Sequence, residues 1–587
     1  MKWSLDELYS DFDSQEYKND FERLEKLIQG FTTWAEKELD LDGDRVTLLG
    51  DYIKFSGEIL TTFIKLRGFA NLSSAVDARD ETAIMQMDKL SLLYTGLTKP
   101  EVDFQNFLKE IDNLDELIES SKLLKEHEFI LRDLKENTKY LLSEKEETLI
   151  SRMKNTGSNA WSNLQNKISS TLLVDIELDG KKESLPISVV RNLAYNKDPE
   201  IRKTAYYAEQ EAYKKIEESS AAALNGIKGE VITVSKLRGF ESPLEETLVK
   251  SRMDRETLDA MLAAMEEFLP VFHKYFKKKA ELLGHKQGLP FYDIFAPVGQ
   301  VNMEFTYPEA MEYIIGNFNK FSDKLGSFVR GAYENNWLDI EPREGKRGGA
   351  FCSNLHPIGE SRVLSNFNGS FSNMTTLAHE LGHAYHGANL MEESILNSSY
   401  PMPIAETASI FCETIVVRAA LKEASKEEAL SILESSISDA AQVIVDIYSR
   451  FLFESMLFEA RESHPLSVNE LKETMMEAQK KAYGDGLDPQ TLHPYMWLNK
   501  PHYYSAGLNF YNFPYAFGLL FSKGLYAEYL KRGDEFVAEY DDLLNATGKN
   551  NIQDVALRMD IDVHNPEFFR NSLKLIEEDI EKFIELA

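Results

Sequence analysis

Two histidines four residues apart, His379 and His383, are the residues of this chain whose spacing most clearly indicates chemistry. On a helix, side chains four positions apart project from one face a turn apart, so both imidazoles can bind one metal ion. Zn²⁺ is the expected metal, because it takes histidine nitrogens and carboxylate oxygens in a tetrahedral site. Glu380 lies between the histidines and would project beside the ion, where its carboxylate can accept a proton from an attacking water.

The residues around this motif favour a helix. Leu377 and Leu381 are apolar at helical spacing, and Ser372 or Asn373 can cap the start. Gly382 is a poor helix former that costs roughly 1 kcal/mol relative to alanine. We therefore expect a second helix or a strand to pack closely against this turn.

A catalytic zinc ion usually has three protein ligands and one open position for water. Glu406 is the candidate third ligand, and we expect it in the first turn of a helix that starts near Pro403. Glu413, seven residues further along the same face, can orient a ligand histidine. His386 is a further candidate for such a supporting contact.

The sequence His379-Glu380-Leu-Gly-His383-Ala-Tyr-His386, followed by Ala405-Glu406-Thr-Ala-Ser409, resembles the oligoendopeptidase F branch of the thimet oligopeptidase family of zinc metallopeptidases. Residues 292–297, 348–352, 366–370 and 510–518 also carry the resemblance. It is strong over roughly residues 200 to 580 and weaker in the N-terminal third. The resemblance implies a mainly α fold, with a prolate helical body and a deep substrate channel that admits short unstructured peptides.

Two strands are expected ahead of the metal helix, at residues 347–353 and 361–367, and they would form a small β-sheet beside it. An extended peptide can add to the edge of such a sheet through main-chain hydrogen bonds, and glycines allow close approach. A plain pair of β-turns is the alternative interpretation. The candidate substrate-binding residues are Gly348, Gly349, Ala350 and Phe351.

A second cluster of polar and aromatic residues lies between residues 501 and 518. Amide hydrolysis builds negative charge on the carbonyl oxygen, and each phenol or imidazole donor can stabilise it by roughly 2–4 kcal/mol. The resemblance implies that a histidine and tyrosines from this segment act in this way. Core packing is the alternative for each aromatic ring. The candidates are Tyr511 and Tyr515, which match the family pattern, and His502 and Tyr504, which match it less closely.

These residues together predict an enzyme, a metalloendopeptidase with one Zn²⁺ ion that hydrolyses internal bonds of short peptides, with Glu380 as the general base. One alternative is a carboxypeptidase or dipeptidase on the same scaffold, with Arg347 or Arg362 binding the free C-terminus. Another is a non-catalytic zinc-containing peptide-binding protein, which would not need Glu380.

The rest of the chain must position these residues. Residues 1–170 predict long amphipathic helices, and His127, between Lys and Glu residues, is expected at the surface. Alternating residues that end in Asp179-Gly180 predict a β-hairpin near 170–190. We place a boundary near residue 195, with an N-terminal helical lobe at 1–195 and a zinc metallopeptidase catalytic domain at 196–587.

The amino-acid composition limits the expected binding partners and cellular compartment of the protein. Lys and Arg number 65 and Asp and Glu 97, and the net charge of −32 disfavours nucleic acid and anionic membranes as partners. Two cysteines exclude a disulfide framework and suit a reducing compartment. No secretory signal and no long apolar run is visible. We therefore expect a cytoplasmic protein whose partners are short peptides.

Overall fold

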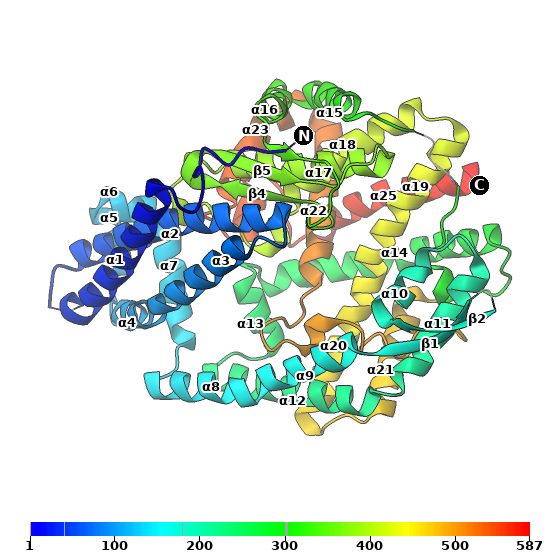
Figure 1. The fold of residues 1–587 in the computed structure, drawn as a ribbon, viewed down its shortest axis with the longest axis horizontal. Helices are drawn as coiled ribbons and strands as arrows, with labels where there is room; N and C mark the ends of the chain where they lie inside the picture. Colours follow the sequence, from blue (N-terminus) through cyan, green and yellow to red (C-terminus); the bar gives the residue numbers. More distant parts are fainter. Residues whose placement is uncertain (1, 40–41, 179, 300–302) are drawn as a thin grey trace. The chain divides into compact units, whose positions relative to one another are not determined.

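The computed structural model describes residues 2–39, 42–178, 180–299 and 303–587. Most of these residues lie in α-helices (Figure 1), which confirms the mainly α fold. No helix in the described ranges is both long and apolar enough to cross a membrane. The chain forms two compact units, each of three segments: unit 1 is Met1–Leu141, Met303–Ala420 and Glu528–Ile561, and unit 2 is Leu142–Asn302, Leu421–Ala527 and Asp562–Ala587. The predicted domain boundary near residue 195 divides the chain by sequence position, whereas each of these units combines three separate segments. The boundary stays a prediction.

Unit 1 contains the first helices of the chain, a small sheet and the histidine motif. Its helices are α1 (Gln15–Glu38), α2 (Arg45–Val76), α3 (Glu81–Tyr94), η1 (Thr95–Leu97), α4 (Thr98–Lys109), α5 (Leu114–Ser120), α6 (Lys122–Glu126), α7 (Glu128–Asn137), η2 (Thr138–Tyr140), α15 (Tyr307–Phe321), α16 (Asp323–Glu334), η5 (His356–Ile358), α17 (Phe371–Ala388), η6 (Ile395–Asn397), η7 (Met402–Ile404), α23 (Asp534–Ala546) and α24 (Ile552–Leu557). Its strands are β3 (Leu338–Asp339), β4 (Phe351–Leu355) and β5 (Glu360–Leu364).

Unit 2 contains the hairpin and the aromatic segment. Its helices are α8 (Glu144–Thr156), α9 (Ser158–Ser170), α10 (Ile187–Asn192), η3 (Leu193–Tyr195), α11 (Pro199–Tyr213), α12 (Glu217–Arg238), α13 (Pro243–Lys250), α14 (Arg255–Leu282), η4 (Phe291–Asp293), α19 (Lys426–Ala441), the π-helical η8 (Gln442–Asp446), α20 (Ile447–Ser463), α21 (Val468–Tyr483), η9 (Pro501–Tyr504) and α25 (Pro566–Leu586). Its strands are β1 (Leu173–Leu178) and β2 (Lys181–Pro186). Two helices contain unit boundaries, α18 (Thr407–Glu423) and α22 (Phe513–Arg532).

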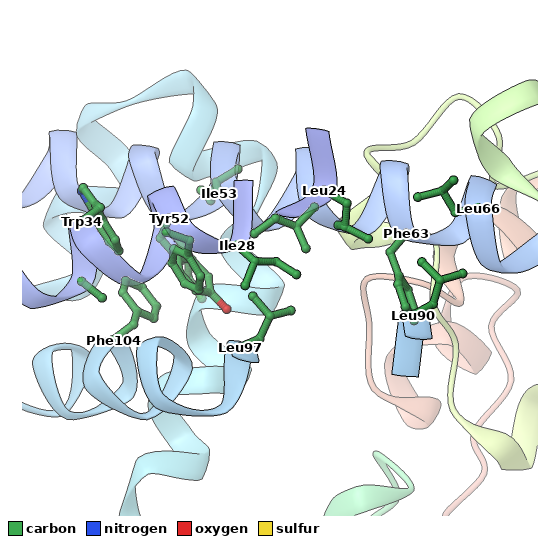
Figure 2. Packing of buried hydrophobic residues seen from close by; sticks show 14 of the residues in the cluster. Leu24, Ile28, Trp34, Tyr52, Ile53, Phe63, Leu66, Leu90, Leu97 and Phe104 are labelled. Atoms are coloured by element: carbon green, nitrogen blue, oxygen red, sulfur yellow. The ribbon is translucent and has the colours of Figure 1, made fainter. Parts of the chain in front are cut away.

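The N-terminal helices of unit 1 share an apolar core (Figure 2). Asp44 caps α2 by accepting the backbone N–H groups of its first turn. The rings of Tyr52 and Phe104 stack with centroids 3.6 Å apart, and Leu24 has no exposed surface. The amphipathic patterns thus form helices as predicted. The expectation for His127 was wrong: it is 3% exposed, and its Nε2 lies 2.8 Å from the hydroxyl of Ser394.

The small sheet of unit 1 has the strand order β3-β5-β4. β4 pairs antiparallel with β5, from Phe351 opposite Leu364 to Leu355 opposite Glu360, and β3 pairs parallel with β5. Helix α17 packs against both β4 and β5, which confirms a small sheet beside the helix of the histidine motif. The predicted strand bounds were displaced: Gly348 and Gly349 form a bend before β4, and β5 ends at Leu364.

The predicted hairpin is present in unit 2 as the antiparallel pair β1 and β2. Val174 and Ile176 are buried while their neighbours are exposed, as the alternation in the sequence requires. Gly180 has a φ of +75°, a conformation that glycine adopts without strain. Asp179 lies outside the described residues.

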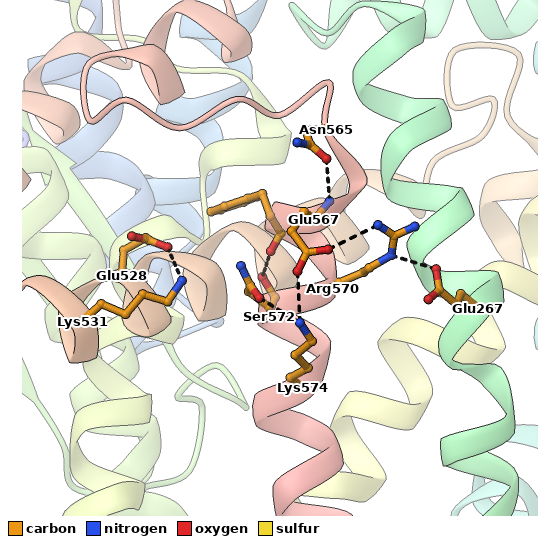
Figure 3. A network of polar contacts seen from close by, with 10 residues as sticks. Glu267, Glu528, Lys531, Asn565, Glu567, Arg570, Ser572 and Lys574 are labelled. Carbon is orange, nitrogen blue, oxygen red and sulfur yellow. Dashed lines mark hydrogen bonds and ion pairs between the residues drawn. The ribbon is translucent and has the colours of Figure 1, made fainter.

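The last helix of unit 2, α25, packs along α14, and the aromatic rings of Tyr275 and Phe583 meet at 5.6 Å. Figure 3 shows polar contacts at the rim of this pair. Arg570 donates to Glu267 at 2.8 Å, and Lys574 donates to Glu567 at 3.0 Å. Of these two ion pairs, only Arg570–Glu267 joins the two helices, and its side chains are 34% and 52% exposed, so the buried rings contribute more to the pairing of α14 and α25 than the charges do.

A buried leucine should contribute more to the stability of unit 1 than an exposed leucine does. We expect Leu24→Ala to lower the free energy of unfolding by about 2–5 kcal/mol, because it leaves a cavity in the core of Figure 2. Leu92→Ala is the matched control, since Leu92 is 75% exposed and its truncation should change stability by less than about 0.5 kcal/mol. Thermal unfolding followed by circular dichroism measures both. Equal melting temperatures for the two variants would contradict the assignment of this core.

Candidate active site

Helix α17 carries the histidine motif. Its N-cap is Ser370, whose hydroxyl accepts the backbone N–H of Asn373, so the predicted cap at Ser372 or Asn373 was wrong. His379 and His383 project from the same face, and their ring centroids are 5.0 Å apart. The spacing in the sequence therefore gives the expected pair of imidazoles.

Gly382 lies where α17 meets the start of α18. A Cβ atom at this position would lie 2.6 Å from both the carbonyl oxygen of Ala408 and the Cα atom of Ser409. Backbone atoms cannot move away as a flexible side chain can, so only glycine fits. This confirms that a second helix packs closely against this turn. The contact brings Glu406 beside the two histidines, although Glu406 directly precedes α18 and Pro403 lies in the separate turn η7.

The three candidate ligands meet at one oxygen. Glu406 Oε2 lies 3.2 Å from His379 Nε2 and 3.4 Å from His383 Nε2. Ligand atoms about 2.0–2.1 Å from a tetrahedral zinc ion would be about 3.3–3.4 Å from one another. The two distances from Glu406 match this spacing, and all three donor atoms lie within 4.8 Å of one another, so they can surround one ion. Each side chain is 20–24% exposed, which leaves the site accessible to a small molecule.

The electrostatics of this cluster favour a cation. Burial acts to lower the pKa of His379, but hydrogen bonds with Glu406 and Glu413 outweigh it and raise the pKa to about 10. Burial acts to raise the pKa of Glu406, but hydrogen bonds with His379 and His383 hold it far below its usual range. A carboxylate that stays ionised in a half-buried site attracts positive charge, which a metal ion can supply as well as a proton.

Two further side chains hold the candidate ligands. Glu413 Oε2 lies 3.0 Å from His379 Nδ1, where it can orient the ring as predicted. The hydroxyl of Ser409 donates to Glu406 Oε2 at 2.6 Å. Sequence reasoning missed Ser409, although its position three residues after Glu406 at a helix start was a usable signal.

His386 makes its described contacts elsewhere. It is fully buried, its Nε2 lies 2.9 Å from the Thr547 hydroxyl, and its ring stacks on Tyr400 at 4.1 Å. Burial lowers the pKa of His386 to about 3, so the ring is neutral. These contacts place His386 on the packed side of α17, and a supporting role at the metal cluster stays a prediction.

Glu380 lies in a hollow of about 600 Å³ that is also lined by His379, Gly349 and Ala350. Burial raises the pKa of Glu380, and the nearby histidines and the Cys352 backbone N–H act against this rise. Gly349 and Ala350 are thus next to the candidate base, as a substrate-binding role requires. Gly348, in the same bend as Gly349, and Phe351, the first residue of β4, are not among the residues that line this hollow.

Strand β4 is fastened to α17 by Asn354. Its Nδ2 donates to the carbonyl oxygen of His383 at 3.3 Å, and its Oδ1 accepts from the Ser361 hydroxyl at 2.8 Å. A Cβ atom on Gly387 would lie 2.3 Å from Cγ of Asn354, so the helix has room for this amide only at a glycine. The candidate binding edge and the metal helix are therefore one packed piece. Sequence reasoning did not single out Asn354.

The candidate oxyanion donors belong to unit 2, whereas the metal cluster belongs to unit 1. The hydroxyls of Tyr511 and Tyr515 are 2.8 Å apart, and the ring of His502 is 5.6 Å from that of Tyr511. Burial and the nearby cation Arg450 lower the pKa of His502 to about 3, so its ring is neutral. Tyr504 is 1% exposed and packs inside unit 2, whereas the other three are partly exposed.

Comparison with known proteins agrees with this arrangement. The family model described as peptidase family M3 matches residues 192–575, and a model described as oligopeptidase F matches residues 110–172. The chain belongs to peptidase family M3. This confirms the resemblance seen in the motif, and the protein is an enzyme of the hydrolase class, a metallopeptidase that acts on peptides.

Full-length relatives resemble this M3 peptidase closely in fold and distantly in sequence. Oligopeptidase PepF of Bacillus subtilis is 24% identical over 100% of this chain and 87% of its own. A crystal structure of a protein from Chlamydophila abortus has a TM-score of 0.86 at 21% identity, over 100% of this chain and 98% of the other. Oligoendopeptidase-F from Enterococcus faecium has a TM-score of 0.72 at 17% identity, over 97% and 99%.

Gly382 offers a test of the helix contact. We expect Gly382→Ala to weaken zinc binding by about tenfold or more, because the added methyl group displaces the start of α18 and with it Glu406. Gly57→Ala is the control, since Gly57 lies within α2 and its Cβ would meet no atom within 4 Å. That variant should keep its zinc affinity and gain up to about 1 kcal/mol of stability. Zinc affinity is measured by titration against a competing chelator. Unchanged affinity in Gly382→Ala would refute the role of the helix contact in placing Glu406.

Proposed function

We propose that this M3 peptidase is a zinc-dependent endopeptidase that hydrolyses internal bonds of short, unstructured peptides. The observation that carries the proposal is the spacing of His379, His383 and Glu406 around one point, with Glu380 in the adjoining hollow. The names of the relatives, an oligopeptidase and an oligoendopeptidase, support internal cleavage of short peptides.

His379, His383 and Glu406 would hold the ion, and two nitrogens with one carboxylate oxygen suit zinc better than the all-oxygen sites of magnesium or calcium. When bound, zinc would polarise the scissile carbonyl group and lower the pKa of the attacking water. Glu413 holds Nδ1 of His379 and so leaves Nε2 directed at the cluster. Ser409 holds the ligand oxygen of Glu406 from the other side.

Glu380 would act as the general base. Its carboxylate accepts the proton of the attacking water and then donates it to the nitrogen of the leaving amine. The hollow around Glu380 supports this role because Gly349 and Ala350 line it too. β4 is the outer strand of its sheet, so an extended peptide that continues past Ala350 along β4 would bring its own main chain to Glu380.

Tyr511, Tyr515 and His502 would stabilise the oxyanion. Tyr511 and Tyr515 are partly exposed residues whose hydroxyls are in contact, and the neutral His502 can donate one N–H. Tyr504, buried inside unit 2, ranks last among the proposed donors.

The exopeptidase alternative loses one of its two candidate groups. Arg362 is 1% exposed and donates to Glu7 at 2.9 Å and to the Ser4 carbonyl oxygen at 2.7 Å. It is therefore occupied within unit 1 and cannot bind a free C-terminus, whereas Arg347 is exposed. We retain the endopeptidase as the proposed activity.

Two statements about organisation remain proposals. The division into residues 1–195 and 196–587 is supported by the start of the M3 match at residue 192. A cytoplasmic location is supported by the presence of only two cysteines, both unpaired.

The role of Glu380 can be separated from metal binding. We expect Glu380→Gln to keep its zinc and to lose about 10²- to 10⁴-fold in kcat, because an amide cannot accept the proton of water. The substrate is a quenched-fluorescent peptide of about ten residues, acetylated and amidated at its ends, which an exopeptidase cannot cut.

Zinc content is measured on each preparation before the assay, and chelation followed by zinc return serves as the control on the wild type. Cleavage that survives complete zinc removal would overturn the metal dependence. A wild-type enzyme that cuts only peptides with a free end would replace the endopeptidase by the exopeptidase.

The tyrosine hydroxyls can be tested singly. We expect Tyr511→Phe to lower kcat by about 100-fold with little change in KM, because a donor to the oxyanion acts in the transition state. Tyr207→Phe is the control, since Tyr207 is another exposed tyrosine of unit 2, 47% exposed, on α11. If both variants keep wild-type kcat, Tyr511 is not a donor.

A further inference from the structure

A lysine without exposed surface contacts the segment that carries Tyr511. Lys228 of α12 donates from Nζ to Glu454 Oε1 on α20 at 2.7 Å and to Asn509 Oδ1 at 2.9 Å. Glu454 is only 2% exposed. A buried ion pair is a weak source of stability, because removing both charges from water offsets most of their attraction. Stability alone therefore does not explain why the Lys228–Glu454 ion pair is buried at this position.

Glu454 uses its two oxygens for two different partners. Oε1 accepts from Lys228, and Oε2 accepts the backbone N–H of Phe510 at 3.0 Å. Phe510 has a φ of +50°, a left-handed conformation that is uncommon for a residue with a side chain. The hydroxyl of Thr247 on α13 donates to the carbonyl oxygen of Asn509 at 3.0 Å. Side chains from α20 and α13 thus hold the backbone at residues 509 and 510, and Lys228 of α12 holds the Asn509 side chain.

Tyr511 is the next residue of the chain. Its hydroxyl meets that of Tyr515 in the first turn of α22, and its ring faces that of His502. On the N-terminal side of residues 509 and 510, Gly507 and Leu508 are exposed. The backbone of residues 509 and 510 is held by hydrogen bonds. The direction of the Tyr511 side chain therefore depends on these two residues and not on the exposed residues before them.

We propose that Glu454, with its charge balanced by Lys228, is a positioning residue that holds the Phe510 backbone and thereby fixes the position of the Tyr511 hydroxyl for its proposed role as an oxyanion donor. The inference rests on the proposed role of Tyr511 as an oxyanion donor. Neither Lys228 nor Glu454 touches substrate in this proposal, because both act through the backbone before Tyr511.

Two double variants separate anchoring from charge. Lys228→Met with Glu454→Gln removes both charges but keeps an amide oxygen that can accept the Phe510 N–H. Lys228→Met with Glu454→Leu removes both charges and the acceptor. We expect the leucine variant to lose about 10- to 100-fold in kcat relative to the glutamine variant, with KM changed less than about twofold, because small displacements of a catalytic group are costly.

A matched pair elsewhere in unit 2 controls for buried charge. Lys279 and Glu434 form a similar buried ion pair at 2.6 Å, in which Glu434 also bonds to Tyr275. Lys279→Met with Glu434→Gln or with Glu434→Leu should give enzymes with equal kcat. Melting temperature and bound zinc are recorded for all four variants, so a loss caused by unfolding is recognised.

The decisive readouts are a mutant cycle and amide exchange. In a Tyr511→Phe background, the difference in kcat between the two Lys228→Met double variants should vanish, and the Phe510 amide should exchange with solvent faster in the leucine variant alone. A difference that persists without the Tyr511 hydroxyl, or equal exchange of Phe510 in both variants, would overturn the positioning role. If Tyr511→Phe alone keeps full kcat, the donor role of Tyr511 and this inference both fall.

Discussion

The site depends on the contact between two helix backbones at Gly382. Without a side chain there, the start of α18 lies against α17, and the contact places a carboxylate beside two imidazoles that are already one helical turn apart. Glycine in a helix interior costs roughly 1 kcal/mol. Any larger residue here would push the start of α18 away and separate Glu406 from the two histidines.

The same contact concentrates negative charge. Glu406 and Glu413 lie on either side of His379, and Glu380 is the next residue along the chain. Half-buried carboxylates so close together are unfavourable unless a cation is shared among them. The carboxylates therefore favour a cation at this point, and the proposed metal ion would supply it. Burial of these charges lowers the stability of unit 1, and burial of its apolar core must offset this cost.

The parts of the site that follow from local geometry were predictable. The spacing of His379 and His383 and the glycine at 382 are constraints within one helix, and Glu406 follows from the need for a third ligand. Long-range contacts were not predictable in this way. His127 is surrounded by charged neighbours in sequence, yet its partner Ser394 is 267 positions away. Lys228 acts through a partner 226 positions away, Asn354 bonds to α17 across 29 positions, and the cap of α17 depends on where the chain leaves the sheet.

The order in which unit 1 is assembled follows from its three segments. Helix α17 is supported on its packed side by α23 and the turn after it, where Asp541 accepts from Tyr385 and Thr547 bonds to His386. Tyr385 and Asp541 are 156 residues apart. During synthesis, the ribosome therefore releases both candidate ligand histidines long before the residues that complete the surroundings of their helix. The proposed metal site can therefore reach its final packing only when the chain is nearly finished, and a fragment that ends before Asp541 lacks these contacts to α17.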